Sequence, residues 1–408
     1  MKWQMINASL LPAKSGHGLV FAGGRIDQVL EKREGLADIL AINLHGMLVL
    51  PGFINAHDSL LATWHAPPAS ESPYRNWLSW DNTVKASPFF QERMRLEMAD
   101  LYELGGYKNI IGGATTVVDH VPAFVRDAYR EHSLAWVLPE YGIAHSLCSY
   151  SLDWGSGFRR EYDYAVENDL PFIMHIAEGS DVESRESLQR LDDLGVLGEH
   201  SVLVHGIGLS ERDLDLIAER GASLVWCPAM NQRIYLRSLN VKAALERQIP
   251  VSLGTDSAMT GSSHYLHEIK AARECYSAMY DTTLELEQLL PMLIDNSVKA
   301  FRIKDRGLFS ADQVGDLVVF NARSSDELDD ILNDGRPGDI FMVIRNGQPV
   351  YGNSSLQEFF DLLEIEVVPV SIDGQKRLVM AEYGQLIQRL QSQSANQAPF
   401  AFLPMELV

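Results

Sequence analysis

The sequence contains few cysteines and no long apolar run. Its three cysteines, Cys148, Cys227 and Cys275, are odd in number and lack CxxC spacing. Neither a disulfide framework nor a cysteine zinc site is therefore predicted. The sequence has no stretch of about 18 apolar residues and no apolar leader in its first residues. We expect a cytoplasmic protein without a membrane segment.

Basic residues are scarce relative to acidic ones. The chain has 34 lysines and arginines against 55 aspartates and glutamates, which gives a net charge of −21. This charge argues against nucleic acid or an anionic membrane as a partner, because both are negative themselves. The 408 residues are 46% hydrophobic and 22% charged. Such a composition is typical of a globular enzyme with one large domain and a smaller one.

Two β-rich ends flank a middle in which strands and helices alternate. Residues 1–50 and 316–352 are typical of short strands joined by turns. In the middle, apolar strand-like runs alternate with helical stretches; they are 115–120, 134–141, 171–178, 201–206, 222–228 and 250–256. Alternation over about 260 residues predicts an α/β fold, a distorted (β/α)8 TIM barrel with a parallel sheet. An open doubly wound sheet is the alternative, but no G-x-G-x-x-G follows the first strand.

The same pattern predicts three parts of the chain. They are a composite β-sandwich from residues 1–50 and 310–365, a barrel catalytic domain over 51–309, and a C-terminal extension over 366–408. Residues 375–391 of the extension are predicted to be helical. Residues 61–88, rich in proline, serine and tryptophan, follow the first barrel strand and are expected to form a lid or pocket wall.

Two helices of the middle have start and stop signals. Ser180-x-x-Glu183 and Ser210-x-x-Asp213 each predict a capping box at a helix N-terminus. Gly221 is expected to end the second of these helices.

Four strand-like runs end in a residue that can bind a metal: His57, His175, His205 and Asp256. One such histidine would more often be a core residue, but four at equivalent strand ends favour a site, because barrel strands carry function at their carboxyl ends. Imidazoles and one carboxylate suit zinc or a similar divalent ion with an open position for water. Glu178 lies three residues after His175. We expect it to act as a general acid or base rather than only to open a helix.

Six segments, in order along the chain, resemble those of one enzyme family. They are INLHGMLVLPGFINAH (42–57), GATTVVDH (113–120), MHIAE (174–178), VLVHGIGLSERDLDLIAERGASLVWCPAMN (202–231), IPVSLGTDS (249–257) and QVGDLVVF (313–320). This ordered set resembles the amidohydrolase superfamily, in its cytosine deaminase and atrazine chlorohydrolase branch. The resemblance implies a barrel with a β-sandwich made from both termini. It also implies a metal-dependent hydrolase of non-peptide C–N bonds in a small cyclic nitrogen compound.

The resemblance also implies roles for individual residues. It makes His57 and His175 metal ligands, Asp256 the carboxylate ligand, Glu178 the proton shuttle, and His205 the residue that orients water or substrate. The metal would be zinc, with iron or manganese as alternatives, because histidine and carboxylate serve all three.

Only one metal ion is expected. A two-metal site bridged by a carboxylated lysine is excluded, because no lysine occurs between Lys108 and Lys242. The expected partner is a small-molecule substrate, and the expected assembly is a homodimer, the commonest one for soluble enzymes.

One position departs from the family's H-x-H pattern. The chain reads His57-Asp58-Ser59, in which Ser59 shares the phase of His57 and should point inward, whereas Asp58 should point away. A serine hydroxyl is a poor zinc ligand. Three outcomes remain open: His205 becomes a full ligand, His65 or His120 reaches in, or the metal is lost. The alternatives to a metalloenzyme are thus a metal-free pseudoenzyme or binding scaffold, and a metal-independent hydrolase or lyase.

Further residues are candidates for substrate contacts. They are Trp64, His120, Glu140, His145, Asn231 and His264. Trp64, Trp77 and Trp80 could stack on a heteroaromatic ring or simply pack in the lid. For His264, a role in a solvated or helix-capping pair with His267 is favoured over a substrate contact.

Overall fold

The computed structural model describes residues 2–12, 16–66, 72–88, 90–394, 400 and 402–408. Residues 67–71 of the expected lid and 395–399 of the expected extension lie outside the described residues. Among the described residues, no helix combines the length and apolar character needed to cross a membrane.

Two parallel sheets form the middle of the chain. The first holds β7 (Phe53–Asp58), β8 (Ala114–Asp119) and β9 (Trp136–Val137) in that order. The second holds β10 (Gly142–Ser146), β11 (Phe172–Ile176), β12 (Ser201–His205), β13 (Ser223–Trp226) and β14 (Val251–Leu253). The last strand returns to the first, because Asp256 N donates to His57 O at 2.9 Å and Asp58 bridges Asp256. The expected α/β class with parallel strands is confirmed.

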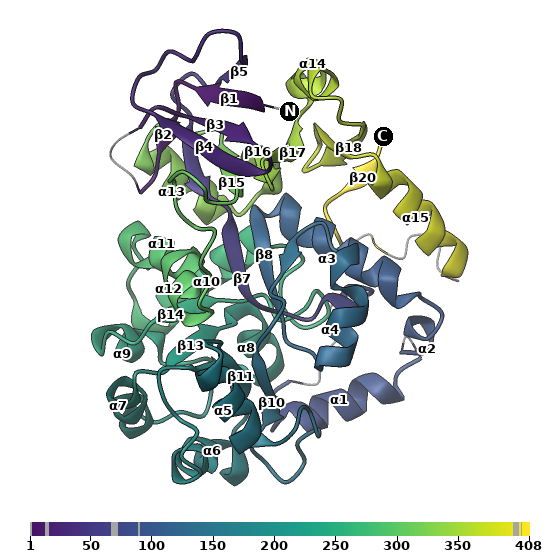
Figure 1. Ribbon diagram of the computed structural model, residues 1–408. Helices are drawn as coiled ribbons and strands as arrows, with labels where there is room; N and C mark the ends of the chain where they lie inside the picture. The colour runs from purple at the N-terminus through teal and green to yellow at the C-terminus, as the bar shows by residue number, and fades with distance from the viewer. Residues whose placement is uncertain (1, 13–15, 67–71, 89, 395–399, 401) are drawn as a thin grey trace.

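Helices occur along the whole chain, and most of those between Trp77 and Ala300 lie around these two sheets (Figure 1). The longer ones are α1 (Trp77–Ala86), α3 (Met98–Ile111), α5 (Phe158–Glu167), α6 (Val182–Asp193), α7 (Glu211–Arg220), α8 (Pro228–Tyr235), α10 (Tyr265–Tyr280), α11 (Leu286–Leu293) and α13 (Ser325–Asp334). The shorter ones are α2 (Phe90–Arg93), α4 (Ala123–Tyr129), α9 (Val241–Glu246), α12 (Asp295–Ala300) and α14 (Gln357–Leu362).

The helix caps agree with the sequence in one case and differ in the other. Ser210 and Asp213 form the expected capping box of α7, which ends at Gly221 with a left-handed φ of 73°. The expected box at Ser180 is wrong by one residue, because Asp181 is the N-cap of α6 and accepts from Ser184 N. An aspartate carboxylate at this position satisfies a free helix N–H as well as serine does.

Strands from both ends of the chain lie together. A four-stranded sheet runs β4 (Arg25–Leu30), β3 (Gly18–Ala22), β1 (Lys2–Ile6), β5 (Leu40–Asn43). An eight-stranded sheet runs β2 (Ser9–Leu10), β6 (Leu48–Pro51), β15 (Leu317–Phe320), β16 (Ile340–Arg345), β17 (Gln348–Asn353), β19 (Gln375–Met380), β18 (Val367–Ile372), β20 (Glu406–Leu407). One buried apolar cluster, which includes Trp3, Leu19, Val49 and Leu317, joins residues of both sheets. Figure 1 shows these strands gathered at one end of the molecule.

The C-terminal residues are part of this arrangement. The helix expected over 375–391 is wrong in its first half, because Gln375–Met380 form strand β19 paired with β17 and β18. Pairing with two neighbouring strands overrides the local helical pattern there. Helix α15 (Glu382–Gln393) follows, and Arg389 Nε donates to Asp100 Oδ1 of α3 at 2.8 Å.

A buried carboxyl on α10 is expected to make stability depend on pH. Glu268 accepts from Ala229 N at 3.0 Å, and burial raises its pKa from 4.5 to about 7. Because the pKa is raised in the folded protein, folding favours the protonated Glu268 carboxyl. The free energy of unfolding is therefore highest below the unfolded pKa and falls as pH rises through the folded pKa. We expect Glu268→Gln to be more stable than wild type at about pH 8, by at most about 3 kcal/mol.

Urea unfolding of both proteins between about pH 5 and pH 8 measures this difference. The stability of Glu268→Gln relative to wild type should rise with pH. Parallel stability curves would contradict the expectation.

Candidate active site and metal centre

Three histidines meet where the parallel strands end. His57 on β7, His175 on β11 and His205 on β12 are buried, and each offers a nitrogen within 4.8 Å of the others. The Nε2 atoms of His57 and His175 are 3.4 Å apart. Two nitrogens that bind one tetrahedral zinc at about 2.0–2.1 Å are separated by about 3.3–3.4 Å. The donor set therefore fits a divalent metal ion.

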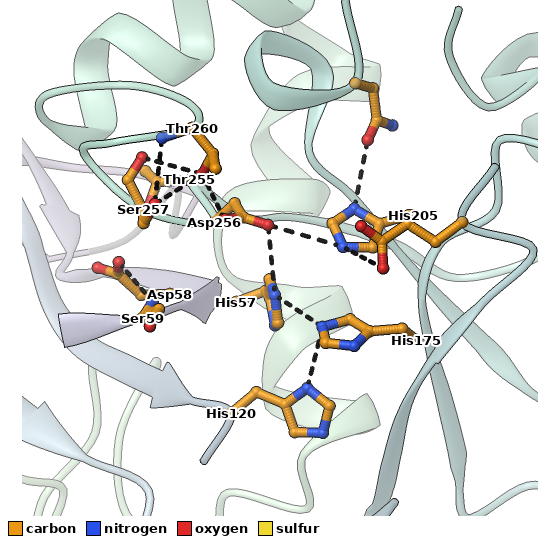
Figure 2. A network of polar contacts seen from close by, with 12 residues as sticks. His57, Asp58, Ser59, His120, His175, His205, Thr255, Asp256, Ser257 and Thr260 are labelled. Carbon is orange, nitrogen blue, oxygen red and sulfur yellow. Dashed lines mark hydrogen bonds and ion pairs between the residues drawn. The ribbon is translucent and has the colours of Figure 1, made fainter. Parts of the chain in front are cut away.

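Two carboxyl groups border the same place. Asp256 Oδ2 lies 3.8 Å from His57 Nε2 and 3.6 Å from His205 Nε2 (Figure 2). Glu178 Oε2 lies 3.9 Å from His205 Nε2. The structure thus brings together the five residues that the sequence singled out, around one cavity of about 270 Å³.

The backbone turns sharply at these strand ends. His205 and Asp256 adopt left-handed conformations, with φ of 76° and 63°, and Ala177, just before Glu178, has a φ of 49°. Such conformations are uncommon for residues other than glycine and cost free energy that neighbouring contacts must offset. For Asp256, those contacts include the backbone hydrogen bonds with His57 and Ser59. The strained turns direct functional side chains into the cavity rather than along the strand.

Burial sets the charges of these groups. It lowers the pKa values of His57 and His175 well below 6.5, with further lowering by neighbouring histidines, and lowers that of His205 to about 3. Neutral imidazoles are the form that binds metals. Burial raises the pKa of Glu178 to about 8 and that of Asp256 to about 6. At neutral pH, Glu178 can therefore hold a proton that Asp256 has lost.

Neighbouring side chains orient these groups. Asn231 Oδ1 accepts from His205 Nδ1 at 3.2 Å, so the Nε2 lone pair of His205 faces the two carboxyl groups. Tyr235 Oη donates to Glu178 Oε1 at 2.7 Å. Asn231, expected at the substrate, lies instead behind His205 as a positioning residue.

Of the two residues after His57, Asp58 takes the expected direction. Asp58 lies in a buried network in which Lys108 Nζ donates to its Oδ1 at 2.7 Å and Asn109 Nδ2 donates to its Oδ2 at 2.8 Å. Figure 2 shows its carboxyl turned away from the histidines. Ser59 borders the cavity, and its N–H donates to Asp256 O at 2.5 Å.

The other expected contact residues fall into different places. His120 and His145 line the cavity. Trp64 is buried and lines an adjacent cavity of about 480 Å³. Glu140 is exposed and stands outside both sets of lining residues. His264 is the N-cap of α10 and accepts from His267 N, the structural role already open from the sequence.

An aromatic wall was only partly foreseen. Trp77, Trp80 and Trp154 line the cavity. The ring of Trp154 lies 4.6 Å from that of His145 and 5.3 Å from that of His120. Sequence reasoning missed Trp154 and Tyr235. The position of Trp154, in the loop after barrel strand β10, was the signal that could have found it.

Comparison with known proteins agrees with this geometry. Residues 163–350 match the amidohydrolase family. The 5-methylthioadenosine/S-adenosylhomocysteine deaminase of Syntrophobacter fumaroxidans is 25% identical over 329 residues, covering 69% of this chain and 74% of the relative. The match over residues 163–350 bears out the resemblance seen in the sequence.

Solved structures show the same fold. An adenosine deaminase from Xanthomonas campestris with bound zinc has a TM-score of 0.73 and 18% identity, over 96% of this chain and 97% of that one. The zinc complex of atrazine chlorohydrolase from Arthrobacter aurescens TC1 has a TM-score of 0.72 and 14% identity, over 96% and 99%. The fold is of the TIM-barrel type found in amidohydrolases.

Proposed function

We propose that this chain is a metal-dependent deaminase that hydrolyses a non-peptide C–N bond of a small cyclic substrate, with one zinc ion as its cofactor. The observation that carries the proposal is the placement of Glu178 and Asp256 on either side of His205, with burial raising the pKa of Glu178 to about 8 and that of Asp256 to about 6. An acid and a base with separated pKa values, beside a cluster of neutral histidines, match the needs of deamination.

Each side chain of the site has a separate role in the proposed hydrolysis. A divalent metal held by His57, His175 and Asp256 would lower the pKa of bound water toward about 7 and supply a hydroxide nucleophile. Asp256 would take the proton from the attacking water. Glu178 donates its proton to a ring nitrogen or to the departing amine, while His205, held by Asn231, orients the reactants. Water adds to the carbon, the C–N bond breaks, and ammonia leaves.

The cavity favours a flat heterocycle. Three tryptophans, Trp77, Trp80 and Trp154, offer faces and edges for an aromatic ring. The adjacent cavity shares Ser59, Ala62 and Met259 with the first, which leaves room for a substituent on that ring. Together with the deaminases named above, this makes adenine nucleosides with a 5′ substituent the first substrates to test.

Ammonia release from adenosine, 5′-methylthioadenosine, S-adenosylhomocysteine, cytosine and guanine tests the proposal. We expect turnover of at least one adenine nucleoside by zinc-loaded protein, loss after the metal is stripped by a chelator, and recovery on zinc addition. Full activity after metal removal would instead support a metal-independent hydrolase. Ligand binding without turnover would support a binding scaffold, which Ser59 in place of a histidine favours.

The finer architecture belongs to the same proposal. A single closed (β/α)8 barrel is supported by the return of β14 to β7 through Asp256 and His57. A β-sandwich from both termini is supported by the shared sheet and by the apolar cluster that joins the two sheets. The domain boundaries, the homodimer and the cytoplasmic location stay predictions.

A further inference from the structure

His120 lies beside the position where Ser59 replaces a histidine. It follows β8, the neighbour of β7, and Asp119 pairs with Asp58 in the parallel register. His120 N donates to Asp58 O at 3.2 Å, so the ends of β7 and β8 lie side by side up to these residues. A side chain from residue 120 can therefore enter the space that a longer side chain at residue 59 would occupy.

His120 lies at ligand spacing from one of the three clustered histidines, His175. Its Nδ1 lies 3.3 Å from Nε2 of His175, and His57 Nε2 approaches that same atom at 3.4 Å. Figure 2 shows both rings directed at His175. Both separations equal the spacing of about 3.3–3.4 Å between two nitrogens on one tetrahedral zinc. Two nitrogens thus approach Nε2 of His175 at the distance expected around a shared cation.

The position of His120 agrees with this role. The residue is 3% exposed, and it lines the same cavity as His57 and His175. His65, the other candidate from the sequence, contacts the backbone of Ala66 and does not line the cavity.

Both ring nitrogens of His205 already face other side chains. Asn231 fixes its Nδ1, and its Nε2 faces Glu178 and Asp256, the two groups that move protons. This is the arrangement expected of a residue that orients water or substrate. If His205 were also the fourth ligand, its lone pair would not be available for that purpose.

We propose that His120 replaces the missing histidine of position 59 as a metal ligand, giving the set His57, His120, His175 and Asp256. His205 then keeps its orienting role. The assignment rests on the metal site of the proposed function, and it concerns this chain's departure from the family pattern.

Metal affinity tests the assignment independently of activity. Zinc content and chelator competition are measured for wild type, His120→Asn, His205→Asn and His145→Asn, with circular dichroism as a check on folding. His145 is the matched control, a buried histidine of the same cavity. We expect His120→Asn to weaken zinc binding by more than about 100-fold, beyond the 10–100-fold range typical of outer residues, whereas the other two variants stay within that range. Unchanged affinity in His120→Asn, or loss in His205→Asn alone, would overturn the assignment.

A second variant distinguishes the loss of a metal ligand from an indirect structural effect of His120→Asn. Adding Ser59→His to His120→Asn should restore zinc binding toward the wild-type value, because it returns a nitrogen ligand to the same space. Failure of this rescue in a folded protein would count against the assignment. Wild type without zinc would overturn both this inference and the proposed function. Zinc bound without deamination would overturn the proposed activity alone.

Discussion

Glu178→Gln is expected to lower kcat by about 10³-fold while zinc content and KM stay close to those of wild type. Glutamine keeps the size of the side chain and an oxygen that can accept from Tyr235, but it has no carboxyl proton to give. Because Glu178 gives up its proton only in the transition state, the substitution lowers kcat and leaves substrate binding nearly unchanged.

A matched control separates this chemical role from a general effect of removing a carboxylate. Glu140→Gln changes an exposed carboxylate outside the cavity and should leave kcat within about twofold of wild type. A kcat within about tenfold of wild type for Glu178→Gln would remove Glu178 from the role of general acid. An equal loss in both variants would point to an effect that does not depend on position.

Lys108→Met is expected to destabilise the protein by about 3–5 kcal/mol. Lys108 and Asp58 form an ion pair at 2.7 Å in which both side chains are 0% exposed. Removing the ammonium leaves the Asp58 carboxylate buried with only amide and backbone donors, among them Asn55 and Asn109. A buried charge without its partner is one of the few causes of so large an effect.

The design of this test uses two comparisons. Lys108→Met combined with Asp58→Asn removes both charges and should recover a large part of the lost stability, measured as the free energy of unfolding in urea. Lys85→Met removes a cation from the exposed pair with Asp81, and its effect should stay below about 1 kcal/mol. If the double variant is as unstable as Lys108→Met, packing of the lysine rather than its charge sustains the fold.

The position of this pair also links stability to the metal site. Asp58 stands between His57 and Ser59 in the sequence, and its network fixes the end of β7. A displaced Asp58 would therefore move His57 away from His175. We interpret the buried network as the support that holds His57, a proposed metal ligand, in place.

The sequence by itself determined the strands that carry the site and the centre of the site. Apolar runs that end in His57, His175, His205 or Asp256 define both a strand and its carboxyl end. In a parallel arrangement, all such ends meet on one side. The direction of Asp58 followed from the alternation of side chains along a strand, which is a local property of the backbone.

Only the tertiary structure decided the contacts between elements distant in sequence. Glu140 and Asn231 looked alike as polar residues after strands, yet one is exposed and the other holds His205. Pairing with β17 and β18 made Gln375–Met380 a strand. The contact of His120 with His175 depends on where β8 lies against β7 and β11. Sequence periodicity predicts which face of a single strand or helix is buried. The distance between side chains on different strands depends on how all the strands are placed, because these side chains meet across the barrel and not along the chain.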